Sequence, residues 1–196
     1  WDSIKTYSME QSFNAVNATP YESEVFVSIP ESSIYRSKTI LKRSFIYTVK
    51  DKEGWIKVPI GGKMNVKDLS VAEQTTMRYE IYDQLAPFIN YKERGLIATT
   101  VGQELVNKVQ TNQVELQGKD IKYNLWFDAK TGMLVRKKES AAGVETTTEL
   151  SDYIKSSYGI LYPSKMIEIN SIDKKPVTIT SKLEVNKPLE TELFVR

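Results

Sequence analysis

The sequence of 196 residues contains no cysteine and no histidine. The lack of cysteine excludes disulfides and thiol chemistry and leaves the redox compartment open. The lack of histidine removes the commonest general base and the commonest metal ligand, so a zinc site would need carboxylates alone. The catalytic and nucleotide-binding motifs HxxEH, GxxxxGK[ST], GxGxxG and GxSxG are absent as well. We therefore predict that the protein is not an enzyme and uses no metal and no cofactor.

Long apolar runs and an excess of one charge are also lacking. A membrane-spanning helix needs about 18 or more consecutive apolar residues, and the sequence has no such run, so we predict no transmembrane segment. Lys and Arg number 27 against 25 Asp and Glu, which gives a net charge of +2. Nucleic acids and anionic membranes attract clustered positive charge, and this balance is too even to indicate such a footprint. We expect no nucleic-acid partner.

What is present is a succession of strand patterns. Tyr123, Leu125 and Phe127 alternate with polar or outward positions, and Gly132 can take the positive φ that the following hairpin turn requires. Similar patterns along the chain predict about eleven antiparallel strands, in a sandwich, a barrel or a sheet curved round a helix. We expect separate strands at 97–101 and 105–109, with Gly102 between them, and a break in the pattern at 61–62. The length and the lack of linkers or repeats indicate a single domain, 1–196.

One helix is predicted after residue 70. Ser70 and Glu73 form a capping-box pattern, which satisfies backbone N–H groups at a helix start. An apolar stripe at helical spacing follows, made of Met77, Ile81, Leu85 and Phe88. The opposite side is expected to carry Glu73, Glu80, Asp83 and Gln84, and Pro87 is expected to end the regular part. The stripe either packs on the sheet as core or forms a lid over a hollow, and both can hold at once.

Aromatic residues are the positive functional evidence. Eleven Tyr, six Phe and three Trp fall mainly on the predicted strands. One interpretation is an ordinary sandwich core. The other is a hydrophobic hollow that binds a ligand, with Phe45, Tyr47, Val49, Tyr123, Leu125 and Phe127 on the sheet and Met77, Ile81, Leu85 and Phe88 above them.

Several short motifs resemble a known family. Residues 127–135 (FDAKTGMLV), 150–153 (LSDY) with 159–165 (GILYPSK), and 184–189 (EVNKPL) with Leu193-Phe194 resemble the outer-membrane lipoprotein-sorting (LolA/LolB-like) superfamily, in the form common in Bacteroidetes. Residues 54–55 (GW) and 85–88 (LAPF) with 91–95 (YKERG) fit the same resemblance. The motifs occur in the expected order and cover nearly the whole chain.

The resemblance implies a mainly β, α+β fold, in which a strongly curved antiparallel half-barrel wraps around a helical lid. It implies that residues 1–5 are the tail of a helix. It also implies a periplasmic protein of outer-membrane lipoprotein sorting that shields an acyl chain of a lipoprotein or another lipid. An export signal or a lipid anchor is then expected upstream of the given sequence. The alternative is a non-transport module of the same fold that docks an envelope protein, as a sensor or as an accessory to a peptidase or envelope complex. No arginine is clearly placed to hold the lid closed; Arg43 and Arg78 are the candidates.

Overall fold

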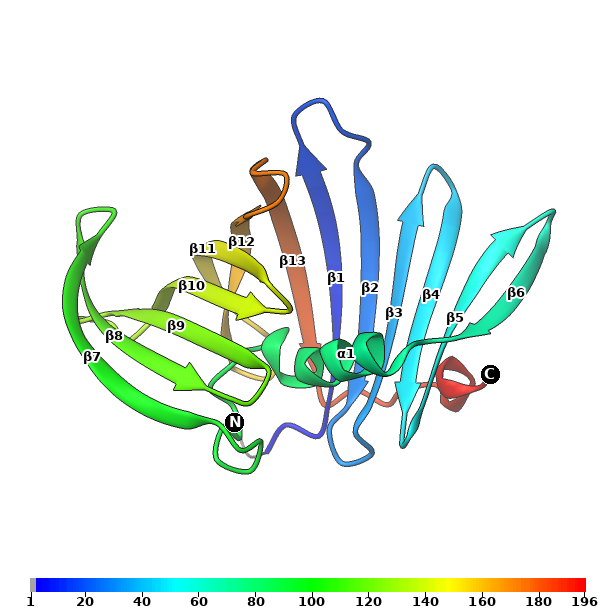
Figure 1. Ribbon diagram of the computed structural model, residues 1–196, viewed down its shortest axis with the longest axis horizontal. Coiled ribbons are helices and arrows are strands. Elements are labelled where there is room, and N and C mark those ends of the chain that lie inside the picture. Colours follow the sequence, from blue (N-terminus) through cyan, green and yellow to red (C-terminus); the bar gives the residue numbers. More distant parts are fainter. Residues whose placement is uncertain (1–2) are drawn as a thin grey trace.

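The computed structural model describes residues 3–196, which form one 13-stranded antiparallel sheet with a single α-helix (Figure 1). The strands are β1 (Thr6–Ala15), β2 (Tyr21–Ser28), β3 (Ser33–Ile40), β4 (Arg43–Lys50), β5 (Glu53–Ile60), β6 (Lys63–Asp68), β7 (Ile97–Val106), β8 (Val109–Gln117), β9 (Ile121–Asp128), β10 (Leu134–Ala141), β11 (Val144–Lys155), β12 (Leu161–Asn170) and β13 (Val177–Val185). The helix α1 spans Val71–Asp83, and a short 3₁₀ turn, η1, spans Thr191–Phe194.

The sheet order is β6-β5-β4-β3-β2-β1-β13-β12-β11-β10-β9-β8-β7. Each strand therefore pairs with its neighbour in sequence, apart from the pairing of β1 with β13, in which Tyr7 lies opposite Val185. This pairing joins two meanders, β1–β6 and β7–β13, into one continuous surface. The sheet is strongly curved, and α1 crosses its concave side from the β6 edge toward the β7 edge (Figure 1). The predicted fold class, a curved antiparallel sheet around a helix, is confirmed.

One strand prediction is wrong, and one strand was missed. Residues 97–106 form one strand, β7, rather than two, because Gly102 makes a β-bulge with φ of 152° instead of a turn; the turn comes at Asn107-Lys108. A bulge inserts an extra residue and leaves the strand continuous. The strand β6 was not predicted. Every residue of this edge strand is exposed, and although Met64 and Val66 alternate with Lys63, Asn65 and Lys67, the run is only six residues long and directly follows the two glycines that interrupt the pattern.

The N-terminal prediction is partly outside the described residues. Of the helix tail expected at 1–5, Trp1 and Asp2 lie outside the part of the chain that the structure describes. Ser3, Ile4 and Lys5 are not helical. Ile4 is buried in the core, and the backbone N–H of Lys5 donates a 2.7 Å hydrogen bond to the Asn186 side chain.

The predicted capping box is confirmed. The Glu73 N–H donates to Ser70 Oγ at 3.3 Å, and the Ser70 N–H donates to a Glu73 carboxylate oxygen at 2.7 Å. The helix ends at Asp83, with Gln84 as its C-cap, which is earlier than the end expected at Pro87. Met77 and Ile81 are the buried residues of α1, so the helix contacts the sheet through a short stretch of apolar surface.

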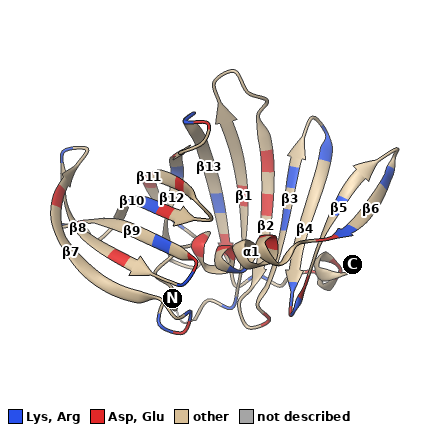
Figure 2. Ribbon diagram, viewed as in Figure 1, with Lys and Arg blue, Asp and Glu red and all other residues tan. Residues whose placement is uncertain are grey.

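The charges are unevenly spread over the sheet (Figure 2). Residues 33–68, which contain β3–β6, carry nine Lys and Arg but only three Asp and Glu. The rest of the chain therefore carries more acidic than basic residues, since the total is only +2. The near-neutral net charge of the chain therefore includes a basic half of the sheet, formed by β3–β6.

Candidate site beneath the helix

All of the predicted lining residues except Phe45 lie in two apolar clusters or pack against them, on the concave face, on the helix and on the segment that follows the helix. Val49, Met77 and Ile81 are buried in one cluster, with Tyr47 and Leu85 packed against it. Tyr123 and Leu125 are buried in the second, with Phe88 and Phe127 packed against it, and the Phe88 and Phe127 rings lie 5.7 Å apart. Phe45 is half-buried near the free end of β4. The structure thus brings the predicted residues together in two groups rather than in one continuous lining.

The space beneath α1 is nearly filled. A cavity at the C-terminal end of the helix has a volume of about 10 Å³ and is lined by Met9, Gln84, Leu85, Ile160, Tyr162, Pro163, Met166, Ser181 and Leu183. Such a volume holds about one water molecule at most. In this closed arrangement the apolar stripe of the helix packs as core, and an acyl chain would need α1 to move away from the sheet.

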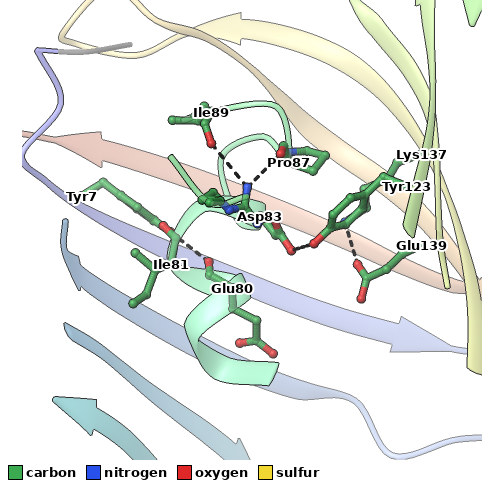
Figure 3. Close-up of polar contacts among 10 residues, drawn as sticks. Tyr7, Glu80, Ile81, Asp83, Pro87, Ile89, Tyr123, Lys137 and Glu139 are labelled. Carbon is green, nitrogen blue, oxygen red and sulfur yellow. Dashed lines mark hydrogen bonds and ion pairs between the residues drawn. The ribbon is translucent and has the colours of Figure 1, made fainter. Parts of the chain in front are cut away.

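Polar contacts fasten the C-terminal end of α1 (Figure 3). Asp83 forms an ion pair with Arg94, at 2.8 Å, and accepts a short hydrogen bond from the Tyr123 hydroxyl on β9. Arg94 also donates to the backbone carbonyl of Pro87 at 2.8 Å. We call Asp83, Arg94 and Tyr123 the latch, because together they join the helix, the segment that follows it and the sheet.

The latch is buried, and its electrostatics follow from that. The Asp83 and Arg94 side chains are each only 7% exposed. Burial raises the pKa of Asp83 above its ordinary value, although the Arg94 guanidinium acts in the opposite direction. Burial, and then the neighbouring Asp83 carboxylate, raises the pKa of Tyr123 far above its ordinary range. Tyr123 is therefore the hydrogen-bond donor to Asp83 at any physiological pH.

Two further contacts hold the last turn of the helix. The buried Tyr7 hydroxyl on β1 donates to the carbonyl of Ile81 at 2.9 Å, and burial raises the pKa of this phenol. Arg36 on β3 forms an ion pair with Glu80 at 2.5 Å. The interpretation of Glu80 and Asp83 as residues of the outer side of the helix is therefore wrong, since both are paired on its inner side.

The arginines of the site were missed by sequence reasoning. Arg43 is exposed at the start of β4, and Arg78 makes no ion pair within residues 3–196. The arginines that contact the helix are Arg36 and Arg94. Arg94 lies within the family-like motif 91–95, which was the one signal in the sequence that pointed to this position.

Comparisons with solved structures identify the fold. The chain is similar to a domain from Vibrio parahaemolyticus named for outer-membrane lipoprotein sorting, with a TM-score of 0.67 and 12% identity over 96% of this chain and 88% of that one. It is similar to a DUF1329 family protein from Desulfovibrio piger, with a TM-score of 0.66 and 14% identity over 99% and 91% of the two chains. A LolA superfamily protein from Nitrosomonas europaea matches with a TM-score of 0.63 and 13% identity, over 97% and 89%. The chain has the LolA fold.

The comparisons made at the level of the sequence identify no relative. No protein-family model matches the sequence, and no curated protein matches it significantly. Within the described part of the chain, no helix is long and apolar enough to cross a membrane. The Bacteroidetes type inferred from the motifs stays a prediction.

This LolA-like chain also has a polar part of its concave face, beside the closed helix. Glu168 on β12, Thr148 on β11 and Lys137 on β10 lie directly opposite one another in the strand pairing, so their side chains share one face. Glu139 follows two residues after Lys137 and lies 3.7 Å from it. Burial raises the pKa of both Glu139 and Glu168.

Two hydroxyl groups on the same face lack partners. The Oγ1 of Thr148 and the Oγ of Ser23 are buried and accept or donate no hydrogen bond within the described residues. Glu168 likewise makes no ion pair or hydrogen bond in residues 3–196, whereas Glu80 and Glu139 are each paired. We call Lys137, Glu139, Thr148 and Glu168 the polar floor. These groups have a desolvation penalty that local contacts do not fully offset.

Proposed function

We propose that the protein is a lipid-binding protein that shields an acyl chain between α1 and the concave face of its sheet. The observation that carries the proposal is the way in which the helix is held. It fully buries two apolar side chains, Met77 and Ile81, while Tyr79 and Tyr82 pack half-buried against the two clusters, and polar contacts fasten it at Glu80, Asp83 and the backbone carbonyl of Ile81. A helix with so few buried residues is a lid that a competing apolar guest can displace.

The hydrophobic terms alone favour displacement, and the latch and the Arg36–Glu80 ion pair oppose it. Moving α1 from the sheet exposes Met77 and Ile81, which costs about 1.5–3 kcal/mol for each side chain. A twelve-carbon chain that takes their place gains about 0.8 kcal/mol per buried CH₂, or about 10 kcal/mol before ordering costs. The apolar residues of both clusters, including Leu125 and Val49, then become the lining that the sequence predicts.

The fold supports a more specific role. Similar structures include a domain named for outer-membrane lipoprotein sorting, and we extend the proposal to a periplasmic carrier of lipoprotein acyl chains or other lipid. The proposed role is binding and not catalysis. The docking-module alternative differs in requiring no bound lipid.

Native mass spectrometry of protein purified without detergent tests the proposal. We expect a mass increment of a lipid or fatty acid on the folded protein, or its appearance with laurate when the purified protein is empty. Ile81→Asn, which places an amide in the lipid-facing stripe, should reduce this binding, while Val71→Asn on the exposed start of the helix should not. A wild-type protein that binds neither an endogenous lipid nor laurate contradicts the proposal and favours the docking module.

A further inference from the structure

Four consecutive hairpins of the sheet end at the same rim. The turns at 16–20, 41–42, 61–62 and 171–176 connect β1–β2, β3–β4, β5–β6 and β12–β13, which are neighbours in the sheet order. In an antiparallel sheet with this order, these connections all lie at one end of the strands. They point the same way in Figure 1, away from α1. We call this edge the hairpin rim.

Each turn of the hairpin rim exposes a large apolar side chain in or beside it. Val16 and Leu41 are each 77% exposed and Ile172 is 75% exposed; Ile60 and Met64 flank the glycines at 61–62 and are also exposed. At the opposite rim, among the described residues in or near the turns 29–32, 51–52, 107–108, 129–133 and 156–160, the exposed large apolar residues include Leu105, Tyr158 and Leu161, and the turns 29–32, 51–52 and 129–133 have none. Single exposed apolar residues are common, but the hairpin rim has at least one at each of four adjacent tips.

The backbone at Leu41 is unfavourable for its residue type. Leu41 and Lys42 have φ of 47° and 66°, so both adopt the left-handed conformation of a type I′ hairpin turn. Asn-Gly is the favoured sequence for such a turn, and leucine is disfavoured there because its Cβ crowds the backbone. An apolar side chain is thus held in water at a position where asparagine would fold better. The cost indicates a role outside folding.

Basic residues accompany the apolar tips. The four turns and the residues that flank them contain Lys42, Arg43, Lys63, Lys174 and Lys175 against one acidic residue, Asp173. The Asp173 carboxylate accepts the N–H of Lys175 at 3.2 Å and so shapes the turn. The side chain of Asn170 accepts the N–H of Ile172 at 2.9 Å and fixes the same loop. The basic half of the sheet, β3–β6, lies behind this rim (Figure 2).

We propose that the hairpin rim docks on the surface of an anionic phospholipid bilayer, with Val16, Leu41, Ile60, Met64 and Ile172 inserted below the headgroups and the lysines facing the phosphates. Insertion removes the exposed tips from water, and each nearby lysine adds attraction to an anionic surface. The even total charge of the chain argued against a membrane footprint, but the local charge of the rim is positive. Docking here leaves α1 and the latch free, so the inference goes beyond acyl-chain binding.

Flotation of the full chain with vesicles tests the proposal. Phosphatidylcholine vesicles serve as the neutral surface, and mixed phosphatidylcholine–phosphatidylglycerol vesicles as the anionic one. We expect binding to the anionic vesicles and much weaker binding to the neutral ones. Raising the ionic strength from about 0.1 M to about 1 M shortens the Debye length from about 10 Å to about 3 Å and should weaken the binding. A wild-type chain that binds neither vesicle, or both equally at all salt concentrations, overturns the proposal.

Rim variants make the test specific. Leu41→Asn and Ile172→Asn should each weaken vesicle binding about 10-fold, as loss of a partly inserted apolar side chain does. Lys174→Gln with Lys175→Gln should weaken it about 5-fold for each lysine. Leu41→Asn should leave the unfolding midpoint unchanged or higher, because asparagine tolerates the left-handed backbone. This separates a docking defect from misfolding.

Tyr158→Asn, at the opposite rim, is the matched control and should leave vesicle binding unchanged. If it weakens binding as much as Leu41→Asn does, the proposal is wrong. Laurate binding in solution distinguishes the two proposals, because rim variants should keep it. A wild-type chain that binds anionic vesicles but not laurate would contradict the lipid-shielding function and would leave the proposal of membrane docking standing.

Discussion

Asp83, the last residue of α1, and Arg94, in the segment that leads to β7, form a buried ion pair with 2.8 Å between Oδ1 and Nη2. Because Tyr123 on β9 donates to the same carboxylate, the pair connects the helix to the far wall of the sheet. Opening the helix must break or move this group, so its strength sets how readily the concave face becomes accessible.

Removing one partner of the latch should destabilise the closed protein. Asp83→Asn leaves the Arg94 charge buried without a counter-ion, and we expect a loss of about 3–5 kcal/mol in the free energy of unfolding. Urea denaturation measures it. The control is Asp68→Asn, which removes the exposed ion pair with Arg196 and should cost less than about 1 kcal/mol. Equal losses of stability in the two variants would show that the buried latch stabilises the protein no more than an exposed ion pair does.

The buried carboxyls predict an unusual dependence of stability on pH. Burial raises the folded-state pKa values of Glu139 and Glu168, so at these two groups the folded protein binds protons more readily than the unfolded chain. Their contribution to stability is therefore present at low pH and is lost as pH rises above about 4, the unfolded value, through the raised folded values. Glu73, Asp128 and Glu145 act in the opposite direction, because hydrogen bonds lower their pKa values.

Glu168→Gln isolates one of these groups. The variant should be more stable than the wild type at pH 7, since it removes an unpaired, partly buried carboxylate, and the advantage should shrink as pH falls toward 4.5, a value near the ordinary carboxyl range of about 4. Thermal unfolding at a series of pH values measures the difference. A constant difference between variant and wild type across the series would contradict the account of the polar floor.

The unpartnered hydroxyl of Thr148 predicts a stabilising substitution. Thr148→Val keeps the shape of the side chain and removes a buried polar atom without a partner, so we expect a gain of about 1 kcal/mol in the free energy of unfolding. Thr39→Val is the matched control, because the Thr39 and Ser44 hydroxyls share a 2.9 Å hydrogen bond. That change should destabilise the protein. Destabilisation by both variants would mean that Thr148 has a partner in solution.

Leu85 and Ile81 should respond differently to truncation. Ile81 is buried on the inner side of the helix, and Ile81→Ala should lower the free energy of unfolding by about 2–5 kcal/mol. Leu85 is half-buried at the small cavity, so Leu85→Ala should cost nearer 1 kcal/mol. Denaturant midpoints for both variants test this. A large loss at Leu85 would place it in tightly packed core rather than at the margin of a hollow.

Much of the fold could be predicted from local signals. Gly132 marks the β9–β10 turn, and the Ser70–Glu73 capping box marks the start of α1, because both depend on backbone requirements that neighbouring residues reveal. The bulge at Gly102 could not be distinguished from a turn, since glycine permits both. The edge strand β6 was missed because its alternating run is short and directly follows Gly61-Gly62.

The site was less predictable than the fold. Alternation correctly places Tyr123 and Leu125 on one face, but the division of the predicted apolar residues into two clusters depends on how the sheet curves. The latch could not be predicted, because the sequence alone does not distinguish a buried aspartate such as Asp83 from an exposed one. Its partner Arg94 is separated from it by a loop whose path only tertiary structure defines.

The central claim is that a lipid chain displaces α1 from the sheet, and the distance between them tests it most directly. The chain has no native cysteine, so spin labels can be attached to cysteines introduced at Thr76, exposed on α1, and Glu10, exposed on β1. Pulsed electron paramagnetic resonance then measures the label separation with and without laurate. We predict one short distance for the empty protein and a longer, broader distribution once laurate binds. An unchanged distance in protein that has bound laurate would contradict the account.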